Sequence, residues 1–307
     1  MYVITKHLTF LALDSAGMVY QAPLDDEKNL LKVYEDSFGN FRFVNENHPK
    51  LDVIKAHYGY HFFDGQHYLS AEPDKNTISI NRAIPLSFET FNFVSCEKAQ
   101  KILGILKSSA EEENIRFINR VNELKAANLP IKLYCAAGTI PRQGFLNLDI
   151  ECQSFPFINN NTEDYFLLPF AQMKWSLDDS SVDYIYHEDF IEHIPQIMQI
   201  QFLAETYRVL KTGAVHRVST PNLISSMLLQ SNFAAGFEGV YTGELRWGHI
   251  ALLSPKFLME LAEMVGYQRI IPAEKNQSVS PFFDYDVRPN SDRQWEDGNI
   301  FVDLIKY

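Results

Sequence analysis

Cysteine is scarce in the sequence, and its positions do not form a metal-binding or disulfide pattern. The 307 residues include three cysteines, Cys96, Cys135 and Cys152, with no Cys-x-x-Cys pair and no cluster of cysteine with histidine. Structural zinc sites use closely spaced ligands of these types, so the sequence predicts no metal site. Free thiols are typical of a reducing compartment, which favours a cytoplasmic location.

Long apolar runs and dense basic segments are also missing. No apolar run approaches the roughly 20 residues that a membrane-spanning helix needs, and residues 1–17 lack the apolar centre and cleavage site of a signal peptide. The chain has 27 Lys and Arg against 39 Asp and Glu, a net charge of −12. Nucleic-acid binding depends on clustered positive charge. This composition therefore argues against a nucleic-acid partner and against anionic membranes.

The patterning of the chain divides it into three parts. Residues 1–95 contain short, aromatic-rich runs separated by turn signals, which is typical of β-strands. Residues 96–130 carry apolar residues at helical spacing, with Ser95 as the expected N-cap. Residues 131–307 alternate strand-like and helix-like segments, which indicates a mostly parallel sheet covered by helices. One helix is expected to end at Gly213, and another to begin at Ser254 and Pro255 and end at Gly266. We therefore predict a small β-rich module, a helical connector and a larger α/β domain.

A small-residue loop followed by an acid marks a candidate ligand site in the larger domain. After the strand-like KLYC come Ala136, Ala137 and Gly138, and the next strand ends at Asp149. Small residues let backbone N–H groups approach a ligand, and such an acid can accept hydrogen bonds from ribose hydroxyls. Ten residues separate Gly138 from Asp149, too few for a helix whose N-terminus could bind pyrophosphate. A cofactor with a ribose but no phosphate fits better than a dinucleotide; an ordinary strand–turn–strand is the alternative.

Four ordered blocks of sequence extend this pattern across residues 131–307. They read KLYCAAGTIPRQGFLNLDI, LDDSSVDYIYHEDFIEHI, LAETYRVLKTGAVHRVSTPNL and WGHIALLSPKFLMELAEMVGY, the last followed by residues 278–307. Together they resemble the class I S-adenosylmethionine-dependent methyltransferases, in particular a bacterial branch found with surface-polysaccharide genes. The resemblance implies a Rossmann-like class I fold, S-adenosylmethionine as the cofactor and methyl transfer as the activity.

The resemblance implies how the loop and the acid would hold the cofactor. Ala136, Ala137 and Gly138 would lie under the methionine part and the ribose, and Asp149 would bind the ribose hydroxyls. Ala136 stands where the family has a glycine. If that position needs a positive φ, alanine costs about 1 kcal/mol. The methionine side of the site is therefore the part that departs most from the family.

Further roles follow from the resemblance. Ala171 would lie beside the adenine, and Phe170 stands where an acid often contacts the adenine amine. His187 and Glu188, at the end of the strand VDYIYH and just beyond it, would face the cofactor sulfonium or the acceptor.

Methyl transfer to a hydroxyl requires a positioned acceptor and removal of its proton. Histidine is the usual base because its pKa lies near neutrality, and the candidate catalytic residues are His187, His193 and His249. His193 could instead brace the start of a helix, and His249 follows Trp247, which could stack on a sugar ring or on adenine. His216 lies inside a predicted strand and is interpreted as structural.

Residues 61–94 resemble one repeat of a fascin-like β-trefoil. The matching positions are Gly65, Tyr68, Leu69, Ala71, Asn81, Arg82, Glu89 and Phe91. Trefoils often bind glycans or proteins, so residues 1–95 are expected to present a glycan acceptor or to serve as a rigid lid or homodimer surface.

The sequence thus predicts a methyltransferase that acts on an oxygen of a sugar or glycan intermediate. The first alternative is a non-enzymatic glycan- or protein-binding protein on a degenerate methyltransferase fold, motivated by Ala136 and Phe170. A small-molecule N-methyltransferase is the second alternative.

Overall fold

The computed structural model describes two compact units of the chain. Described are residues 1–5, 9–16, 18–23, 29–37, 40–44, 50–56, 59–72, 76–85, 91–138, 141–150, 164–172, 174–222, 249–251, 253–287 and 299–307. The described residues up to Ser108 form the first unit, and those from Ser109 onward form the second. Among the described helices, none is long and apolar enough to cross a membrane.

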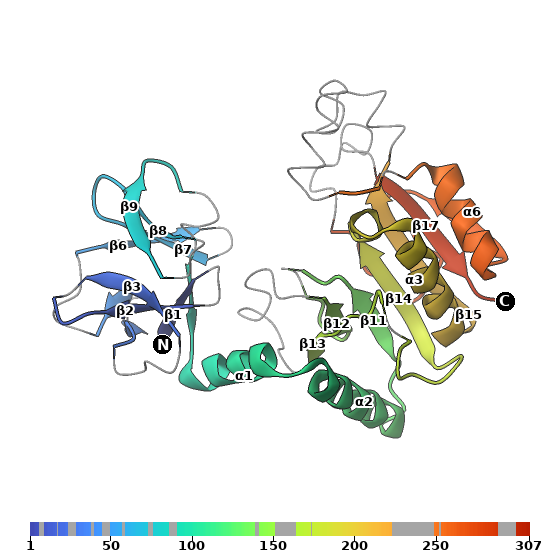
Figure 1. The fold of residues 1–307 in the computed structure, drawn as a ribbon, viewed down its shortest axis with the longest axis horizontal. Coiled ribbons are helices and arrows are strands. Elements are labelled where there is room, and N and C mark those ends of the chain that lie inside the picture. The colour runs from blue at the N-terminus through green and yellow to red at the C-terminus, as the bar shows by residue number, and fades with distance from the viewer. Residues whose placement is uncertain are drawn as a thin grey trace. The chain divides into compact units, whose positions relative to one another are not determined.

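The first unit is built around an antiparallel sheet (Figure 1). Its strands are β1 (Tyr2–Thr5), β2 (Phe10–Leu13), β3 (Val19–Ala22), β4 (Val33–Glu35), β5 (Phe41–Phe43), β6 (Asp52–Ala56), β7 (Gly59–Phe63), β8 (Tyr68–Ala71), β9 (Ile78–Arg82) and β10 (Phe91–Val94). The main sheet has the order β3-β2-β1-β10-β7-β8-β9, β6 pairs with β7, and β4 pairs with β5. Phe62 and Phe91 pack edge to face in its core. The β-rich prediction is confirmed, and the trefoil comparison stays a prediction.

The stretch that the sequence pattern predicted as a helical connector, residues 96–130, forms two helices. Helix α1 (Cys96–Lys107) belongs to the first unit, and α2 (Ala110–Ala126) belongs to the second. The break lies at Ser109, which starts α2 with a capping box. Its hydroxyl accepts from the backbone N–H of Glu112, whose carboxylate accepts from the backbone N–H of Ser109. A reciprocal cap satisfies backbone donors at a helix start and so favours a new helix at this point.

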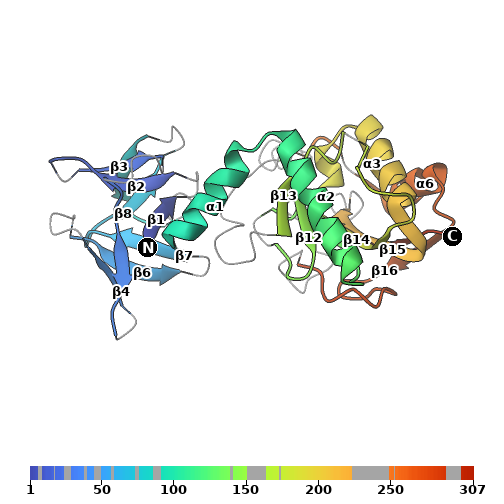
Figure 2. The same cartoon turned by 90° about the horizontal axis from the view of Figure 1, so that it is seen from below.

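The second unit contains a seven-stranded sheet with helices packed on one face (Figure 2). Its elements are β11 (Lys132–Cys135), β12 (Leu146–Asp149), β13 (Tyr165–Leu167), β14 (Val182–Glu188), the 3₁₀ helix η4 (Ile191–His193), α3 (Gln196–Val209), β15 (Leu210–Pro221), α6 (Pro255–Val265), β16 (Arg269–Ala273) and β17 (Asn299–Ile305). The strand order is β13-β12-β11-β14-β15-β17-β16. β17 pairs antiparallel with both β15 and β16, and the other neighbouring pairs are parallel. The predicted Rossmann-like, mostly parallel sheet is confirmed.

The strand order reverses between β11 and β14. The chain moves outward from β11 to β12 and β13, then returns to the other side of β11 as β14. In open α/β sheets, ligands bind outside the carboxyl ends of the strands at such a reversal. The loop after β11 and the residues after β14 are therefore the places where a ligand site is expected.

Helix ends follow the sequence signals at α6 but not at α3. Ser254 caps α6, Pro255 begins it and Gly266 ends it with a φ of 116°, as predicted. The sequence pattern placed the end of α3 at Gly213, but the helix ends at Val209. Leu210 already pairs with Val182 of β14, and Gly213 has a φ of 80° and donates to the Lys306 carbonyl. Sheet pairing therefore replaces the last predicted helical turn.

The two faces of the sheet differ in chemistry. The face under α2, α3 and α6 is apolar, with Leu133, Ile185 and Val218 in one core cluster. The opposite face carries Arg217, fully buried and paired with Asp286 at 2.7 Å and with Asp303 at 3.4 Å. The described segment 274–287 covers this polar face. Buried charges are tolerated only when they are paired in this way.

Candidate functional site

The loop after β11 turns through two left-handed residues. Ala136 has a φ of 56° and Gly138 a φ of 53°. A non-glycine residue in the left-handed region costs about 1–2 kcal/mol. The loop therefore carries backbone strain at Ala136, the position where the resembling family has a glycine. Among the described residues, a Cβ at Gly138 would meet only the Ala136 carbonyl oxygen, at 3.9 Å. The described part of the chain therefore leaves space beside the Gly138 backbone.

Asp149 ends β12 beside this loop. Its carboxylate accepts hydrogen bonds from the Gly138 N–H (2.8 Å), the Ile150 N–H (2.8 Å) and the Tyr165 hydroxyl (3.0 Å). The side chain is fixed in orientation, and the residue is 9% exposed. A ribose hydroxyl donating to Asp149 would compete with these donors. Tyr165 is the one that can yield, because its hydroxyl also lies 3.4 Å from the Gly138 carbonyl.

Cys135 precedes the loop and is not a reactive thiol. Burial, assisted by the charge of Asp149, raises the pKa of the Cys135 thiol well above its usual value. The thiolate is the nucleophilic form of cysteine, so Cys135 remains a neutral core residue at the end of β11.

His187 lies inside the helix-covered core. Its Nδ1 is 2.8 Å from His216 Nε2, and its ring packs against Phe190 and Phe202. Burial lowers the pKa of His187 to about 3. The sequence placed this histidine toward the sulfonium or the acceptor, but the side chain points to the helix face of β14. A neutral histidine enclosed in the core does not suit a base acting on an acceptor.

His216 belongs to the same buried chain of polar groups. Its Nδ1 lies 3.3 Å from the Tyr267 hydroxyl, which lies 3.0 Å from the Thr206 hydroxyl. Burial, with the neighbouring His187, lowers the pKa of His216 well below its usual value. These contacts agree with the structural role expected for His216.

The residues after β14 form the other side of the strand reversal. Glu188 is buried at the end of the strand, and Asp189 has a φ of 46°. The Asp189 carboxylate accepts from the Asn299 side-chain amide at 3.0 Å. Ala136 and Asp189 thus place strained residues after adjacent strands, and such strain gathers at functional sites.

Phe170 and Ala171, the residues that the resemblance places near the adenine, are both buried in the structure. The Phe170 ring is buried among Phe190 and Phe202, with centroid distances of 5.0 and 5.9 Å. It therefore belongs to the core cluster of the second unit. Ala171 is also buried, in the turn after β13. Residues 139–140, 151–163 and 173 lie outside the described residues.

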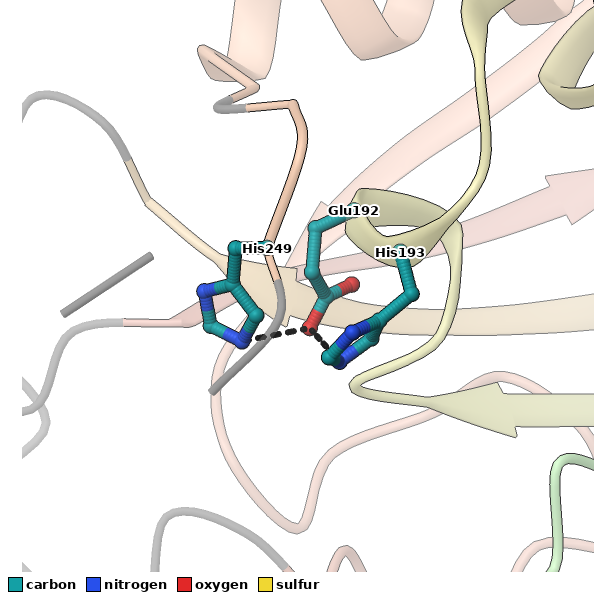
Figure 3. A group of neighbouring side chains, drawn as sticks. All are labelled: Glu192, His193 and His249. Atoms are coloured by element: carbon teal, nitrogen blue, oxygen red, sulfur yellow. Dashed lines mark ion pairs between the residues drawn. The ribbon is translucent and has the colours of Figure 1, made fainter. Parts of the chain in front are cut away.

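Glu192, His193 and His249 come together near the carboxyl ends of β14 and β15 (Figure 3). Glu192 Oε1 lies 3.8 Å from the Nε2 atoms of both histidines, and the two rings meet at 80° with centroids 4.6 Å apart. Burial and the neighbouring His193 lower the pKa of His249 to about 4. At neutral pH, His249 is therefore uncharged and does not form an ion pair with Glu192. Trp247 lies outside the described residues.

His193 and His249 were both predicted as candidate catalytic residues, but the sequence could not show that they lie next to Glu192. Glu192 and His193 are neighbours in η4, whereas His249 comes from a separate segment after β15. The Ile250 and Ala251 N–H groups donate to the Glu192 carbonyl at 2.9 and 3.0 Å. No local sequence pattern predicts that His249 lies beside Glu192 and His193, because only the fold brings the two segments together.

Comparisons with known proteins add a distant likeness. No family model and no curated protein matches the sequence. A SAM-dependent methyltransferase from Archaeoglobus fulgidus is 15% identical over 66% of this chain and 96% of its own, with a TM-score of 0.41. A possible histamine N-methyltransferase from Thermotoga maritima is 15% identical over 64% and 91%, with a TM-score of 0.40.

A third solved structure, phosphoethanolamine N-methyltransferase 2 from Haemonchus contortus in complex with S-adenosyl-L-methionine, is 13% identical. The match covers 83% of this chain and 71% of that protein's chain, with a TM-score of 0.39. These likenesses are too distant to assign a substrate. The strand order and the reversal at β11 define the second unit as a Rossmann-like domain.

Proposed function

We propose that the second unit binds S-adenosylmethionine and transfers its methyl group to an acceptor. The observation that carries this proposal is the Asp149 carboxylate, held against the Gly138 N–H at the strand reversal. An acid at this place is suited to ribose hydroxyls. The ordered sequence blocks that resemble class I methyltransferases support the same assignment.

The residues present fit the ribose side of this cofactor. Asp149 supplies carboxylate oxygens, and the described residues leave space beside the Gly138 backbone. Glu188, at the end of β14, would place a negative charge near a positively charged sulfonium. When bound, S-adenosylmethionine supplies an activated methyl group, and the protein positions the acceptor for in-line attack.

The proposed acceptor is an oxygen of a sugar or glycan intermediate. A hydroxyl acceptor needs a group that takes its proton. Of the three predicted catalytic histidines, His193 suits this role best, because its side chain is 34% exposed while His187 is enclosed. His193 would take the hydroxyl proton as the oxygen gains the methyl group, with Glu192 and His249 beside it. The glycan-type resemblance of residues 61–94 also favours this acceptor class.

A methyl-transfer assay tests the acceptor class. The purified protein would be incubated with S-adenosylmethionine and a panel of sugars, nucleotide sugars and amines, and formation of S-adenosylhomocysteine would be measured. The proposal expects product with a hydroxyl acceptor and a large loss of rate in His193→Ala. Glu260→Gln on the exposed side of α6 is the matched control. Transfer to amines alone would overturn the oxygen assignment.

The second candidate function is non-enzymatic binding of a glycan or protein. The observations that favour it are the methyl group of Ala136, which stands where the family has a glycine, and the hydrogen bond from Tyr165 to Asp149. The methyl group takes up space in the loop, and the Tyr165 hydroxyl competes with a ribose hydroxyl for Asp149. This alternative expects no affinity for S-adenosylhomocysteine, and binding of glycans that is unchanged by Asp149→Ala.

A further inference from the structure

The Glu192, His193 and His249 side chains, here named the EHH cluster, converge on one point. Each offers one ligand atom, and these atoms all lie within 4.8 Å of one another. The 3.8 Å separations between Glu192 Oε1 and the two Nε2 atoms are longer than hydrogen bonds. Direct pairing therefore does not account for the way that the three groups face each other in Figure 3.

The separations approach those of ligands around one metal ion. Donors about 2.0–2.2 Å from a tetrahedral zinc lie roughly 3.4 Å from one another. The two 3.8 Å distances from Glu192 Oε1 would have to shorten by a few tenths of an ångström, and the ligand nitrogens of the two histidines, which lie within 4.8 Å of each other, would also have to approach. All three ligand atoms lie at the ends of side chains, so rotation about side-chain bonds changes these distances.

The surroundings fix the ligand that is most deeply buried. Glu192 is 1% exposed, and its other carboxylate oxygen, Oε2, accepts from the Thr220 hydroxyl at 2.8 Å. Outer contacts of this kind orient metal-binding carboxylates. The backbone bonds from Ile250 and Ala251 to the Glu192 carbonyl hold the His249 segment beside η4. Ligands from two segments are thus held together by hydrogen bonds that do not use the ligand atoms.

We propose that the EHH cluster binds one divalent transition-metal ion, with Zn²⁺ as its natural type. Two imidazoles and one carboxylate form a three-ligand set that catalytic zinc sites use, with a fourth position left for water or substrate. The partly exposed His193 gives this position a route to solvent. The sequence pattern predicts no metal site because it lacks closely spaced cysteines. The EHH cluster needs no cysteine, since its ligands are one carboxylate and two imidazoles.

This inference deepens the proposed function, and its chemical role rests on that function. A metal lowers the pKa of an oxygen ligand, so an acceptor hydroxyl bound at the open position would lose its proton to solvent more readily. In the metal-bound form, His193 would be a ligand and the metal would replace it as the activating group. Metal binding itself does not depend on methyl transfer.

Calorimetry with Zn²⁺ alone tests the site. Protein treated with a chelator and dialysed would be titrated with ZnCl₂ at neutral pH, and its metal content would be measured by elemental analysis after removal of excess metal. The inference expects one equivalent of Zn²⁺ bound with a micromolar or lower dissociation constant. His193→Ala and Glu192→Gln should each weaken binding by at least about 100-fold, and His67→Ala in the first unit should not.

Two further readouts keep the test decisive. Circular dichroism would confirm that His193→Ala is folded, which is expected because this side chain is partly exposed. A Co²⁺-loaded sample should show the visible absorption of a site with nitrogen ligands, and His193→Ala should lose it. Equal Zn²⁺ affinity in His193→Ala and wild type, or no stoichiometric binding by wild type, would overturn the inference.

A separate titration with S-adenosylhomocysteine distinguishes the two proposals. Zn²⁺ binding without affinity for S-adenosylhomocysteine would support the EHH site and count against the proposed function. Affinity for S-adenosylhomocysteine without Zn²⁺ binding would count against the metal site alone.

Discussion

Replacement of Ala136 by glycine should stabilise the second unit. Ala136 has a φ of 56°, and the left-handed conformation costs alanine about 1–2 kcal/mol. Glycine removes this strain but gives the unfolded chain more freedom, which costs about 0.4–1 kcal/mol. The difference leaves a net gain of about 1 kcal/mol. With a urea m-value of roughly 2 kcal/mol/M, the unfolding midpoint should rise by roughly 0.5 M.

Tryptophan fluorescence measures this change in the correct part of the chain. The three tryptophans, Trp175, Trp247 and Trp295, all belong to residues 131–307, so their signal reports on the unit that contains the loop. The matched control is Ala137→Gly. Ala137 is buried and does not have a positive φ, so glycine there should lower stability by about 1 kcal/mol or more.

Backbone strain at Ala136 predicts stability changes of opposite sign: Ala136→Gly should raise the unfolding midpoint, and Ala137→Gly should lower it. A midpoint that falls in Ala136→Gly, or one that shifts in the same direction in both variants, would refute the reasoning. The same variant tests whether the Ala136 methyl group crowds the cofactor. If it does, Ala136→Gly should bind S-adenosylhomocysteine more tightly than wild type.

Three other variants test buried polar groups of the second unit. Arg217→Leu leaves two buried carboxylates without their cation and should lower the free energy of unfolding in urea by about 3–5 kcal/mol. The control Lys256→Gln, at an exposed ion pair, should change that free energy by less than about 0.5 kcal/mol. Tyr165→Phe removes a donor that competes for Asp149 and should tighten S-adenosylhomocysteine binding by about 5-fold in calorimetry; weaker binding would assign Tyr165 to the cofactor site. The pKa of His187 is lowered to about 3, so the unfolded chain binds more protons below about pH 6.5. Stability should therefore fall as the pH drops from 6.5 toward 3, and His187→Phe should make this fall less steep; an equal slope in both proteins would contradict the buried, neutral histidine.

The order of helices and strands in the second unit could be predicted because local sequence signals determine it. The loop of Ala136 to Gly138, the acid at Asp149 and the caps of α6 each depend on neighbours in the chain. At α6, the proline at the helix start and the glycine at its end act through the local backbone and need no distant partner.

Tertiary pairing decided what the sequence could not show. Gly213 has the signal of a helix end, yet Leu210 already pairs with β14, and α3 ends earlier, at Val209. His187 lies at the end of its strand as predicted, but the alternation of strand side chains turns it toward the core. The EHH cluster joins η4 to a distant segment. Its geometry depends on the Glu192 carbonyl accepting two backbone bonds from residues 250 and 251.

Calorimetric titration of S-adenosylhomocysteine into the purified full chain tests the central claim most directly. The proposed function predicts binding in the micromolar range that Asp149→Ala abolishes, while Glu260→Gln binds as wild type does. Absence of binding by the wild-type protein, or binding that is unchanged in Asp149→Ala, would contradict a cofactor site built from Asp149 and Gly138.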